Sequence, residues 1–541
     1  MGIALKTIMY ILTDSILGGS AWALLDMLKE MENSIRPVVI IPGKGLTEER
    51  LKQLEIQYYV IPFRIKFCKI GAGSRQLEDS IFREDYAAAL QLQPIIDKEK
   101  VDLIHTNSSI CNVGAIAALL SGKPHIWHLR ELLEEHFGCE FVDKELKKEL
   151  FEHTEEFIAI SNCVKEIYEH KFGIHTTCIY DGLELERYLC EEVYHDKGNT
   201  FLLVGIINDG KGQWDAVRAV ELLVSRGVSQ LRLTIVGNGD QKVMWSLKKY
   251  IARKKLCDYV YVQPFQHDLS NLRADHTYSL TCSKMEALGR TTIEAILAGN
   301  IVIGADTGGT LEIIGNNCER GYLYRQGDYE NLAEIMYNVI CEEQQAKIGK
   351  SRLAKRFVRE NFGLREYVVL IMHLYDDVID RYKAKVSEER DDLIQKMSKR
   401  YEGLTPPGKE TGGTDEKKFE MMFKYTELWL RIKQQEYSLA DFFLKKNIRR
   451  IGIYGMGFLG CDLYDELENT DIEIAYVMDR EAQTIDKVVP VVSVDEDLPC
   501  VDAIVITAIS VENKIQEWLQ GLCSYTIIRL TEVLESYREM I

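Results

Sequence analysis

One recurring unit constrains the fold of this chain more than any other feature: a short apolar run, then a glycine turn, then an amphipathic helix. Apolar runs of this length are typical of strands buried on both faces of a parallel sheet, with helices covering those faces. The sequence therefore predicts an α/β protein made of doubly wound parallel sheets. The clearest runs are Thr7–Leu12 before Gly18 and Gly19, Phe201–Val204 before Gly205, and Arg450–Tyr454 before Gly455.

At 541 residues the chain is too long for a single hydrophobic core. We expect folded parts at 1–190, at 191–385 and, as a smaller module, at 418–541. Residues 386–417 begin as a densely charged helix and continue into a stretch rich in glycine and proline, a composition typical of a flexible linker.

The composition disfavours several classes of partner. The formal net charge is -18 and the isoelectric point is about 5.3, so no overall positive field attracts nucleic acid, and we expect no nucleic-acid partner. The 13 cysteines show no zinc-ligand spacing, which favours free thiols in a reducing compartment and no metal site. No apolar stretch is long enough to cross a bilayer, and Asp14 interrupts the N-terminal apolar run. We expect a cytoplasmic protein and leave open peripheral contact with the inner face of the membrane.

The stretch from Glu286 to Ile314 contains a turn suited to an anion. Gly289 lets backbone N–H groups approach a ligand closely, and the helix that follows, with Thr291 or Thr292 as its N-cap, supplies partial positive charge at its start. Arg290 adds a guanidinium that can bind a phosphate through two parallel hydrogen bonds. The turn therefore predicts a phosphate-binding site.

Two glutamates flank this turn, eight positions apart. Glu294 lies one turn into the helix, where its carboxylate could accept hydrogen bonds from a pair of ribose hydroxyls. Glu286 precedes the turn, where it could hold a sugar hydroxyl. Together with the phosphate-binding turn they form a candidate nucleotide-sugar site. The alternative is an ordinary amphipathic helix with solvated glutamates.

Residues 200–360 resemble the C-terminal domain of the retaining family 4 glycosyltransferases, and residues 7–185 more weakly resemble their N-terminal domain. The motifs occur in the family's order: Leu203-Val204-Gly205, Lys211-Gly212, Val236-Gly237-Asn238-Gly239, the stretch Glu286–Glu294, and Gly308-Gly309 followed by Glu312. The resemblance implies the GT-B fold, in which two Rossmann-like doubly wound domains face a cleft, here with a small C-terminal Rossmann-like α/β module appended. It makes 1–190 the acceptor-side domain and 191–385 the nucleotide-sugar-binding domain, whose last helix packs back on the first.

The resemblance also assigns site residues. It implies that His128 and Glu286 contact the donor sugar, and these are the catalytic candidates. His105 also ends a predicted strand, but His128 is the better match to the family's histidine. In place of the arginine that usually follows Gly205, this chain has Ile206, which removes one of two expected diphosphate cations. The donor-binding candidates are Gly19, Lys211, Asn238, Gly289, Arg290, Thr291 and Glu294.

The module beyond the linker carries a dinucleotide-binding fingerprint. Gly455, Gly457 and Gly460 follow the strand Arg450–Tyr454, and Asp479 ends the next strand, 479 − 455 = 24 positions beyond the first glycine. A carboxylate at that distance is placed to reach a ribose hydroxyl. We expect the module to bind a nucleotide or an assembly partner, and a purely structural role is the alternative.

The resemblance predicts a metal-independent hexosyltransferase that moves a sugar from a nucleoside-diphosphate sugar to a glycan or lipid-linked acceptor with retention of configuration, in surface polysaccharide biosynthesis. No cofactor is expected beyond this donor substrate. The C-terminal module leaves open a bound nucleotide, a homo-oligomer or a partner protein. Two alternatives remain: a non-catalytic GT-B subunit that binds glycan or a partner protein, motivated by Ile206, and a sugar-nucleotide epimerase of the same fold.

Overall fold

The computed structural model divides the chain into two compact units, Met1–Thr405 and Pro406–Ile541. The boundary falls inside the predicted linker, whose helical part belongs to the first unit. The structure describes residues 5–13, 15, 17–65, 67–190, 194–228, 230–266, 268–382 and 388–404 of the first unit, and 421, 424–425, 428–429, 431–433, 435, 437–455, 458–467, 470–478, 498–509, 511–522 and 525–538 of the second.

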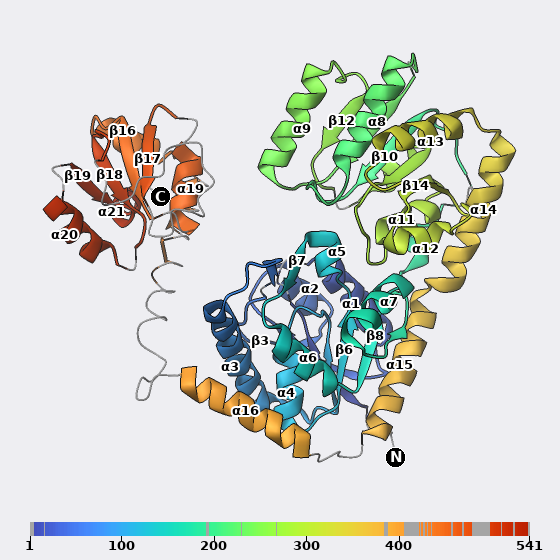
Figure 1. Ribbon diagram of the computed structural model, residues 1–541, viewed down its shortest axis with the longest axis horizontal. Helices are drawn as coiled ribbons and strands as arrows, with labels where there is room; N and C mark the ends of the chain where they lie inside the picture. Colours follow the sequence, from blue (N-terminus) through green and yellow to red (C-terminus); the bar gives the residue numbers. More distant parts are fainter. Residues whose placement is uncertain are drawn as a thin grey trace. The chain divides into compact units, whose positions relative to one another are not determined.

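The first lobe of the first unit is a seven-stranded parallel sheet in the order β3-β2-β1-β5-β6-β8-β9 (Figure 1). Every residue of β1, β5, β6 and β8 is buried, as expected for strands between two layers of helices. The strands are β1 (Thr7–Ile11), β2 (Arg36–Ile41), β3 (Gln57–Val60), β5 (Leu103–Thr106), β6 (His125–Leu129), β8 (Glu156–Ala159) and β9 (Thr177–Cys178). The helices are α1 (Gly19–Glu30), α2 (Leu46–Gln53), α3 (Arg75–Glu99), α4 (Val113–Ser121), α5 (Leu133–Phe137), α6 (Lys144–Glu152) and α7 (Asn162–Phe172).

The second lobe is a six-stranded parallel sheet in the order β12-β11-β10-β13-β14-β15. The order reverses between β10 and β13, and the carboxyl ends of strands on either side of such a reversal leave a crevice for ligands. The strands are β10 (Thr200–Val204), β11 (Arg232–Val236), β12 (Val260–Gln263), β13 (Tyr278–Thr281), β14 (Ile301–Ala305) and β15 (Tyr322–Tyr324). The helices are α8 (Gln213–Ser225), α9 (Gln241–Arg253), α10 (Ser270–Ala274), α11 (Arg290–Leu297), α12 (Gly308–Ile314) and α13 (Tyr329–Cys341).

Two helices return the chain from the second lobe to the first. They are α14 (Gln344–Asn361) and α15 (Leu364–Arg381), which meet at Phe362 and Gly363. The helix α15 packs against α1 and buries Tyr367, Ile371 and Tyr375 in the core under the first sheet. The expected crossing of the last helix onto the first lobe is therefore present.

Two further segments of the first unit pack on its first lobe. The charged helix α16 (Glu388–Leu404) packs against α3 and α4, with Leu393 and Met397 buried and the Arg400 guanidinium 2.9 Å from Asp79. The glycine-containing stretch near residue 70 forms β4 (Phe67–Lys69), which pairs antiparallel with β7 (Cys139–Phe141).

The second unit contains a parallel sheet in the order β17-β16-β18-β19. This is the strand order of a doubly wound α/β fold. The strands after β16 are added first on one side of it, as β17, and then on the other side, as β18 and β19. The strands are β16 (Arg450–Tyr454), β17 (Glu473–Met478), β18 (Ala503–Ile506) and β19 (Thr526–Arg529), and the helices are α18 (Ala440–Lys445), α19 (Phe458–Leu467), α20 (Glu512–Leu522) and α21 (Leu530–Glu535).

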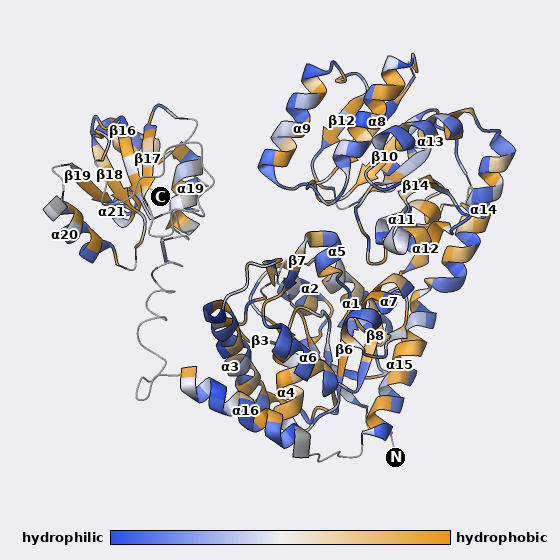
Figure 2. Cartoon of the chain, in the orientation of Figure 1, coloured by the Kyte–Doolittle hydropathy of each residue, from blue (hydrophilic) through white to orange (hydrophobic). Residues whose placement is uncertain are grey.

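Hydrophobic residues are concentrated in the strands and on the helix faces that cover them (Figure 2). One buried cluster of the first unit joins β1 and β2 to α1 and α15, and another lies on β10, β11 and β13. A further cluster runs from the first sheet and α4 into α11 and α12 of the second lobe. Among the residues that the structure describes, no helix is both long and apolar enough to span a membrane.

A carboxylate joins the two lobes of the first unit. Glu312, in α12, accepts hydrogen bonds from the backbone N–H groups of Asn162 at 3.1 Å and Cys163 at 2.5 Å, at the start of α7. It also accepts one from the Tyr180 hydroxyl at 3.0 Å. A helix N-terminus carries unpaired N–H groups and partial positive charge, so it stabilises a carboxylate brought from the other lobe.

Replacing Glu312 by alanine removes this acceptor and leaves the first N–H groups of α7 without a partner between the lobes. We expect the free energy of unfolding to fall by about 1–2 kcal/mol, the usual value for a charge-assisted hydrogen bond that water partly replaces. Differential scanning calorimetry should show a melting temperature lower by several degrees. Glu312→Gln keeps one acceptor oxygen and should lose less. Equal melting temperatures for the alanine variant and the wild type would contradict this role.

Candidate active site

A cavity of 1340 Å³ lies in the first unit where both sheets present the carboxyl ends of their strands. The first lobe contributes the start of α1, the loop after β6 and the segment Asp181–Cys190. The second lobe contributes the loops after β10 and β11 and the start of α11. This is the edge at which open parallel sheets bind their ligands.

The helix α11 begins at this cavity without a side-chain cap. Its N-cap is Gly289, whose φ of 90° lies in the left-handed region that glycine favours. The predicted cap on a threonine is therefore wrong: the helix starts at Arg290, and the buried Thr292 hydroxyl lies 3.0 Å from that of Thr281. Gly289, Arg290 and Thr291 line the cavity. The Thr292 N–H donates to the Gly289 carbonyl at 2.9 Å, whereas the N–H groups of Arg290 and Thr291 have no backbone partner among the described residues and are available to an anion.

The loop that carries Glu286 rests on the start of α12. The Gly309 N–H donates to the Glu286 carbonyl at 2.8 Å. A Cβ atom on Gly309 would lie 2.3 Å from the Leu288 carbonyl oxygen, closer than a side chain can approach. The pair of glycines after β14 thus fixes the height of this loop over the cavity.

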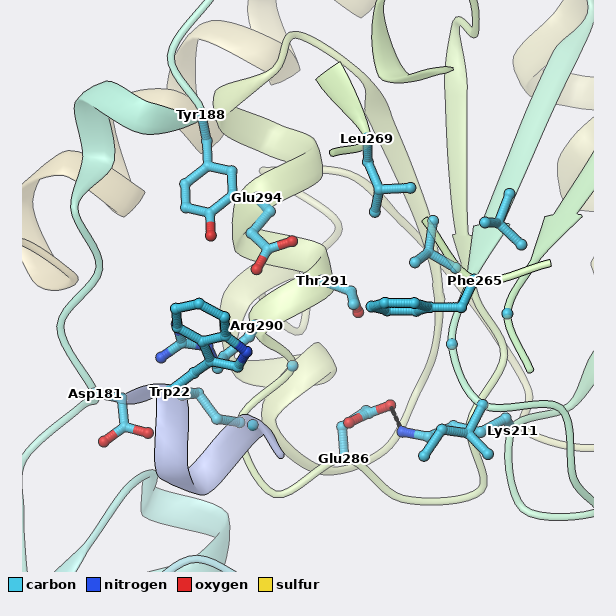
Figure 3. A pocket seen from close by; sticks show the side chains of 18 of the residues that line it. Trp22, Asp181, Tyr188, Lys211, Phe265, Leu269, Glu286, Arg290, Thr291 and Glu294 are labelled. Atoms are coloured by element: carbon cyan, nitrogen blue, oxygen red, sulfur yellow. Dashed lines mark hydrogen bonds and ion pairs between the residues drawn. The ribbon is translucent and has the colours of Figure 1, made fainter. Parts of the chain in front are cut away.

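Lys211 and Glu286 meet at one end of the cavity, and Glu294 and Tyr188 stand at the other (Figure 3). The Lys211 ammonium donates to the Glu286 carboxylate at 2.6 Å, and the Ser283 hydroxyl donates to it at 2.5 Å. Burial alone would raise the pKa of Glu286, but the charge of Lys211 and these hydrogen bonds outweigh burial and lower it. Glu286 is therefore ionised, and its carboxylate can accept hydrogen bonds.

Arg290 is a cation with an unused donor. Its Nη2 atom lies 3.8 Å from the Asp26 carboxylate of the first lobe, and its Nη1 atom is buried with no hydrogen-bond partner in the part of the chain that the structure describes. A buried guanidinium nitrogen without an acceptor costs free energy. A phosphate oxygen at this position would recover that cost.

Arg273 is a site residue that sequence reasoning missed. Its side chain, 4% exposed, donates to the Glu294 carboxylate at 2.5 Å. It comes from the short helix α10, and its guanidinium carbon lies 5.8 Å from the centre of the Tyr188 ring. The Arg273 guanidinium holds one oxygen of the Glu294 carboxylate, and this contact orients the carboxylate within the cavity lining. No glycine turn or strand end marks Arg273 in the sequence.

The structure places His128 beneath the cavity and not in its lining. The side chain is fully buried, with Nδ1 3.2 Å from His105 Nε2 and 3.3 Å from an Arg130 nitrogen. Its Nε2 atom lies 3.8 Å from Asp181 and has no hydrogen-bond partner among the described residues. Burial and the charge of Arg130 lower the pKa of His128 and His105 well below the usual value, so both rings are neutral. In this arrangement His128 supports residues of the lining, unlike the direct sugar contact expected of it.

The residues that His128 supports form the floor on the first-lobe side. Arg130 donates to Asp181 at 2.5 Å and to the Asn107 side chain at 3.0 Å, and both members of the ion pair are almost fully buried. Glu131 accepts hydrogen bonds from the Ser109 N–H at 3.0 Å and hydroxyl at 2.9 Å. Arg130, Asp181 and Glu131 all line the cavity, so this floor is polar and rigidly held.

The remaining predicted donor residues, Gly19 and Asn238, also line the cavity. A Cβ atom on Gly19 would meet nothing within 4 Å, so the backbone there is open to a ligand. The Asn238 side-chain oxygen accepts from the Phe265 N–H at 3.1 Å. Ile206, 63% exposed, lines the cavity at the place of the missing arginine.

In the second unit, the structure describes part of the predicted nucleotide-binding turn. Gly455 has a φ of 94°, and a Cβ atom on Gly460 would lie 2.0 Å from the Gly455 carbonyl oxygen, so both positions require glycine. Gly457 and Asp479 lie outside the described residues, and the role of this turn stays a prediction.

Comparisons with known proteins agree with this architecture. Residues 17–187 match the model of Glycosyltransferase Family 4, and residues 191–354 match that of Glycosyl transferases group 1. An Escherichia coli UDP-Gal:alpha-D-GlcNAc-diphosphoundecaprenol alpha-1,3-galactosyltransferase is 24% identical over 323 residues, which cover 55% of this chain and 80% of that protein.

Solved structures share the fold. The crystal structure of Anabaena HepE in complex with UDP and glucose has a TM-score of 0.57 at 21% identity, covering 69% of this chain and all of that one. The sucrose-phosphate synthase of Thermosynechococcus elongatus has a TM-score of 0.55 at 15% identity, covering 70% of this chain and all of that one.

Two facing Rossmann-like lobes around a cleft define a protein of the GT-B class, which confirms the predicted fold. The two family models together cover 171 + 164 = 335 of the 541 residues. The chain belongs to the family 4 glycosyltransferases.

The buried histidines predict a pH dependence of stability. Burial lowers the pKa of His105 and His128, and it lowers the pKa of His125 to about 3. In the unfolded chain, each of these histidines has the ordinary pKa of about 6.5. Below that pH the unfolded state binds more protons, so the free energy of unfolding falls by up to about 1.4 kcal/mol per pH unit for each histidine. The melting temperature should decline from about pH 7 to about pH 5, and less steeply in His125→Asn. A flat wild-type profile over this range would contradict neutral histidines.

Proposed function

We propose that the protein is a hexosyltransferase that moves a sugar from a nucleoside-diphosphate sugar to a glycan or lipid-linked acceptor with retention of configuration, without a metal ion, in surface polysaccharide biosynthesis. The observation that carries the proposal is the convergence on one cavity of an uncapped helix N-terminus, Lys211, Arg290 and Glu294. The E. coli relative named for a UDP-galactose donor and a diphosphoundecaprenol acceptor supports the class of both substrates. Retention and metal independence rest on the family resemblance.

The site orders the donor along the cavity. Glu294, held by Arg273, accepts the ribose hydroxyls, and the apolar side chains of Phe265 and Leu269 border the cavity beyond it (Figure 3). The diphosphate lies at the start of α11. Charge that develops on the leaving diphosphate is stabilised there by first-turn N–H groups and by Arg290, in a site already built for it.

The other end of the cavity holds the transferred sugar. Glu286 accepts a sugar hydroxyl, while Lys211, 2.6 Å from it, donates toward the sugar or the near phosphate. The floor of Arg130, Asp181 and Glu131 faces the acceptor from the first lobe. The bond between the sugar carbon and a diphosphate oxygen breaks, and the nucleoside diphosphate leaves. An acceptor hydroxyl oxygen forms the new bond to that carbon, and its proton passes to the leaving diphosphate.

A non-catalytic GT-B subunit is the second candidate, because Ile206 removes a cation from the diphosphate site. The unpaired Nη1 atom of Arg290 favours the enzyme, since it supplies a cation from the opposite wall. Isothermal titration with UDP separates the two: a degenerate subunit shows no binding heat, whereas the proposed enzyme binds.

Lys211→Ala should lower turnover by about a hundredfold, the usual effect of removing one group that stabilises developing charge. The assay measures transfer from a UDP-hexose to a polyprenyl-diphosphate-linked sugar. Lys284→Ala is the matched control, because Lys284 is an exposed lysine outside the cavity lining, and it should retain wild-type turnover. Equal turnover in Lys211→Ala and Lys284→Ala would remove Lys211 from the site.

Glu294→Gln should weaken UDP binding by about tenfold or more, since a charged acceptor for two hydroxyls is lost. Arg273→Ala should weaken it in the same direction, because Glu294 then loses the partner that orients it. The measurement is calorimetry with UDP and, as a control, with inorganic diphosphate, which has no ribose and should bind both variants as it binds the wild type. Loss of diphosphate binding along with UDP would mean that the variants damage the whole site.

A further inference from the structure

The outer face of α9 in the second lobe is a basic stripe around one exposed indole. The helix contains no aspartate or glutamate, although the whole chain has a net charge of -18. Trp245 is 64% exposed. The exposed residues at positions i, i+3, i+7 and i+11 of the helix are Lys242, Trp245, Lys249 and Arg253, with Lys248 beside them. We refer to these five residues as the α9 stripe.

The core of the second lobe is built from the other face of α9. Leu247 and Ile251 are buried there, whereas the α9 stripe lies at the surface. The Lys249 ammonium lies 4.5 Å from the centre of the Trp245 ring, so an indole and a cation are presented together at the surface. One exposed apolar side chain is normal for a folded protein, but an indole set among cations is suited to a ligand outside the fold.

The start of α9 lies near the cavity. The turn that precedes α9 contains Asn238, which lines the cavity, and α9 starts three positions later. The other lobe borders the cavity with an apolar rim. Phe137 lines the cavity, the Phe67 ring of β4 stacks on the Phe137 ring, and Ile70 follows β4, with its backbone N–H 3.3 Å from the Gly138 carbonyl oxygen.

These three rim residues are exposed, by 44% for Phe67, 59% for Ile70 and 50% for Phe137. The Phe67 and Phe137 rings stack with their centres 6.4 Å apart, so the rim presents a continuous apolar edge. Figure 1 shows α9 in the second lobe and the α5–β7 segment in the first, both on the side of the first unit away from α14.

We propose that the α9 stripe and the apolar rim dock the first unit on an anionic lipid bilayer. Lysine and arginine side chains are attracted to anionic headgroups, and an indole prefers the depth of those headgroups. Exposed apolar side chains, such as those of the rim, bury at the boundary between headgroups and acyl chains. A polyanion such as a nucleic acid would use the cations but not an apolar edge. The inference does not depend on the proposed activity, although docking here would bring the mouth of the cavity to a membrane.

Co-sedimentation of the full-length protein with vesicles tests the proposal. We expect binding to vesicles of phosphatidylcholine with phosphatidylglycerol, little binding to phosphatidylcholine alone, and loss of binding at high salt, because surface charge is screened. Lys248→Glu/Lys249→Glu should weaken binding by at least about tenfold, since each cation near an anionic surface contributes a severalfold factor. Trp245→Ala should weaken it without changing its salt dependence.

A matched control reverses the charge of two exposed lysines, Lys148 in α6 and Lys399 in α16. The variant Lys148→Glu/Lys399→Glu should leave binding unchanged. Circular dichroism melting confirms that each variant is folded, and UDP titration shows whether the donor site is intact, independently of the membrane. Two results would overturn the proposal: no binding of the wild-type protein to anionic vesicles, or equal losses in the α9 and control variants. Binding to anionic and neutral vesicles alike would also overturn it, because the cations would then contribute nothing.

Discussion

The site depends on the start of α11, which no side chain in the described part of the chain caps. Gly289 turns into α11 with a φ of 90°, a conformation that costs most other residues free energy, and the glycines that open α12 press the preceding loop into place. The unpaired N–H groups of α11 then lie at the crevice where the strand order of the second sheet reverses. The backbone of α11 therefore places partial positive charge at the cavity, in a protein whose net charge is strongly negative.

Around this helix start, the buried charges are arranged in pairs. Lys211 with Glu286, Arg273 with Glu294, and Arg130 with Asp181 each bring two opposite charges within 2.6 Å. Paired charges tolerate partial burial, whereas removal of one partner leaves a charge that is costly to bury. The pairs hold their side chains in fixed positions before any ligand arrives. Arg290 differs, because its Nη1 atom is buried with no hydrogen-bond partner among the described residues, so an acceptor brought there by a ligand would gain free energy.

Local features could be predicted from the sequence, and long-range contacts could not. The strand, glycine turn and helix units are set by neighbouring residues, so β1, β10 and β16 lie where the pattern places them. Arg273 was missed because its contact with Glu294 is made across 21 positions with no motif. His128 ends a strand as expected, yet only the surrounding packing decides that its ring is covered. The charged composition of α16 concealed Leu393 and Met397, whose spacing of one helical turn buries them against α3.

The return of α15 to the first lobe has a consequence for synthesis on the ribosome. The last strand of the first sheet ends at Cys178, and α15 begins at Leu364, 364 − 178 = 186 residues later. Tyr367, Ile371 and Tyr375 of α15 share one buried cluster with β1 and α1. The part of this face that α15 covers beside α1 therefore stays exposed while the whole second lobe is translated. Chaperones have this interval in which to bind it, and the nascent first lobe cannot complete its core before the second lobe has emerged.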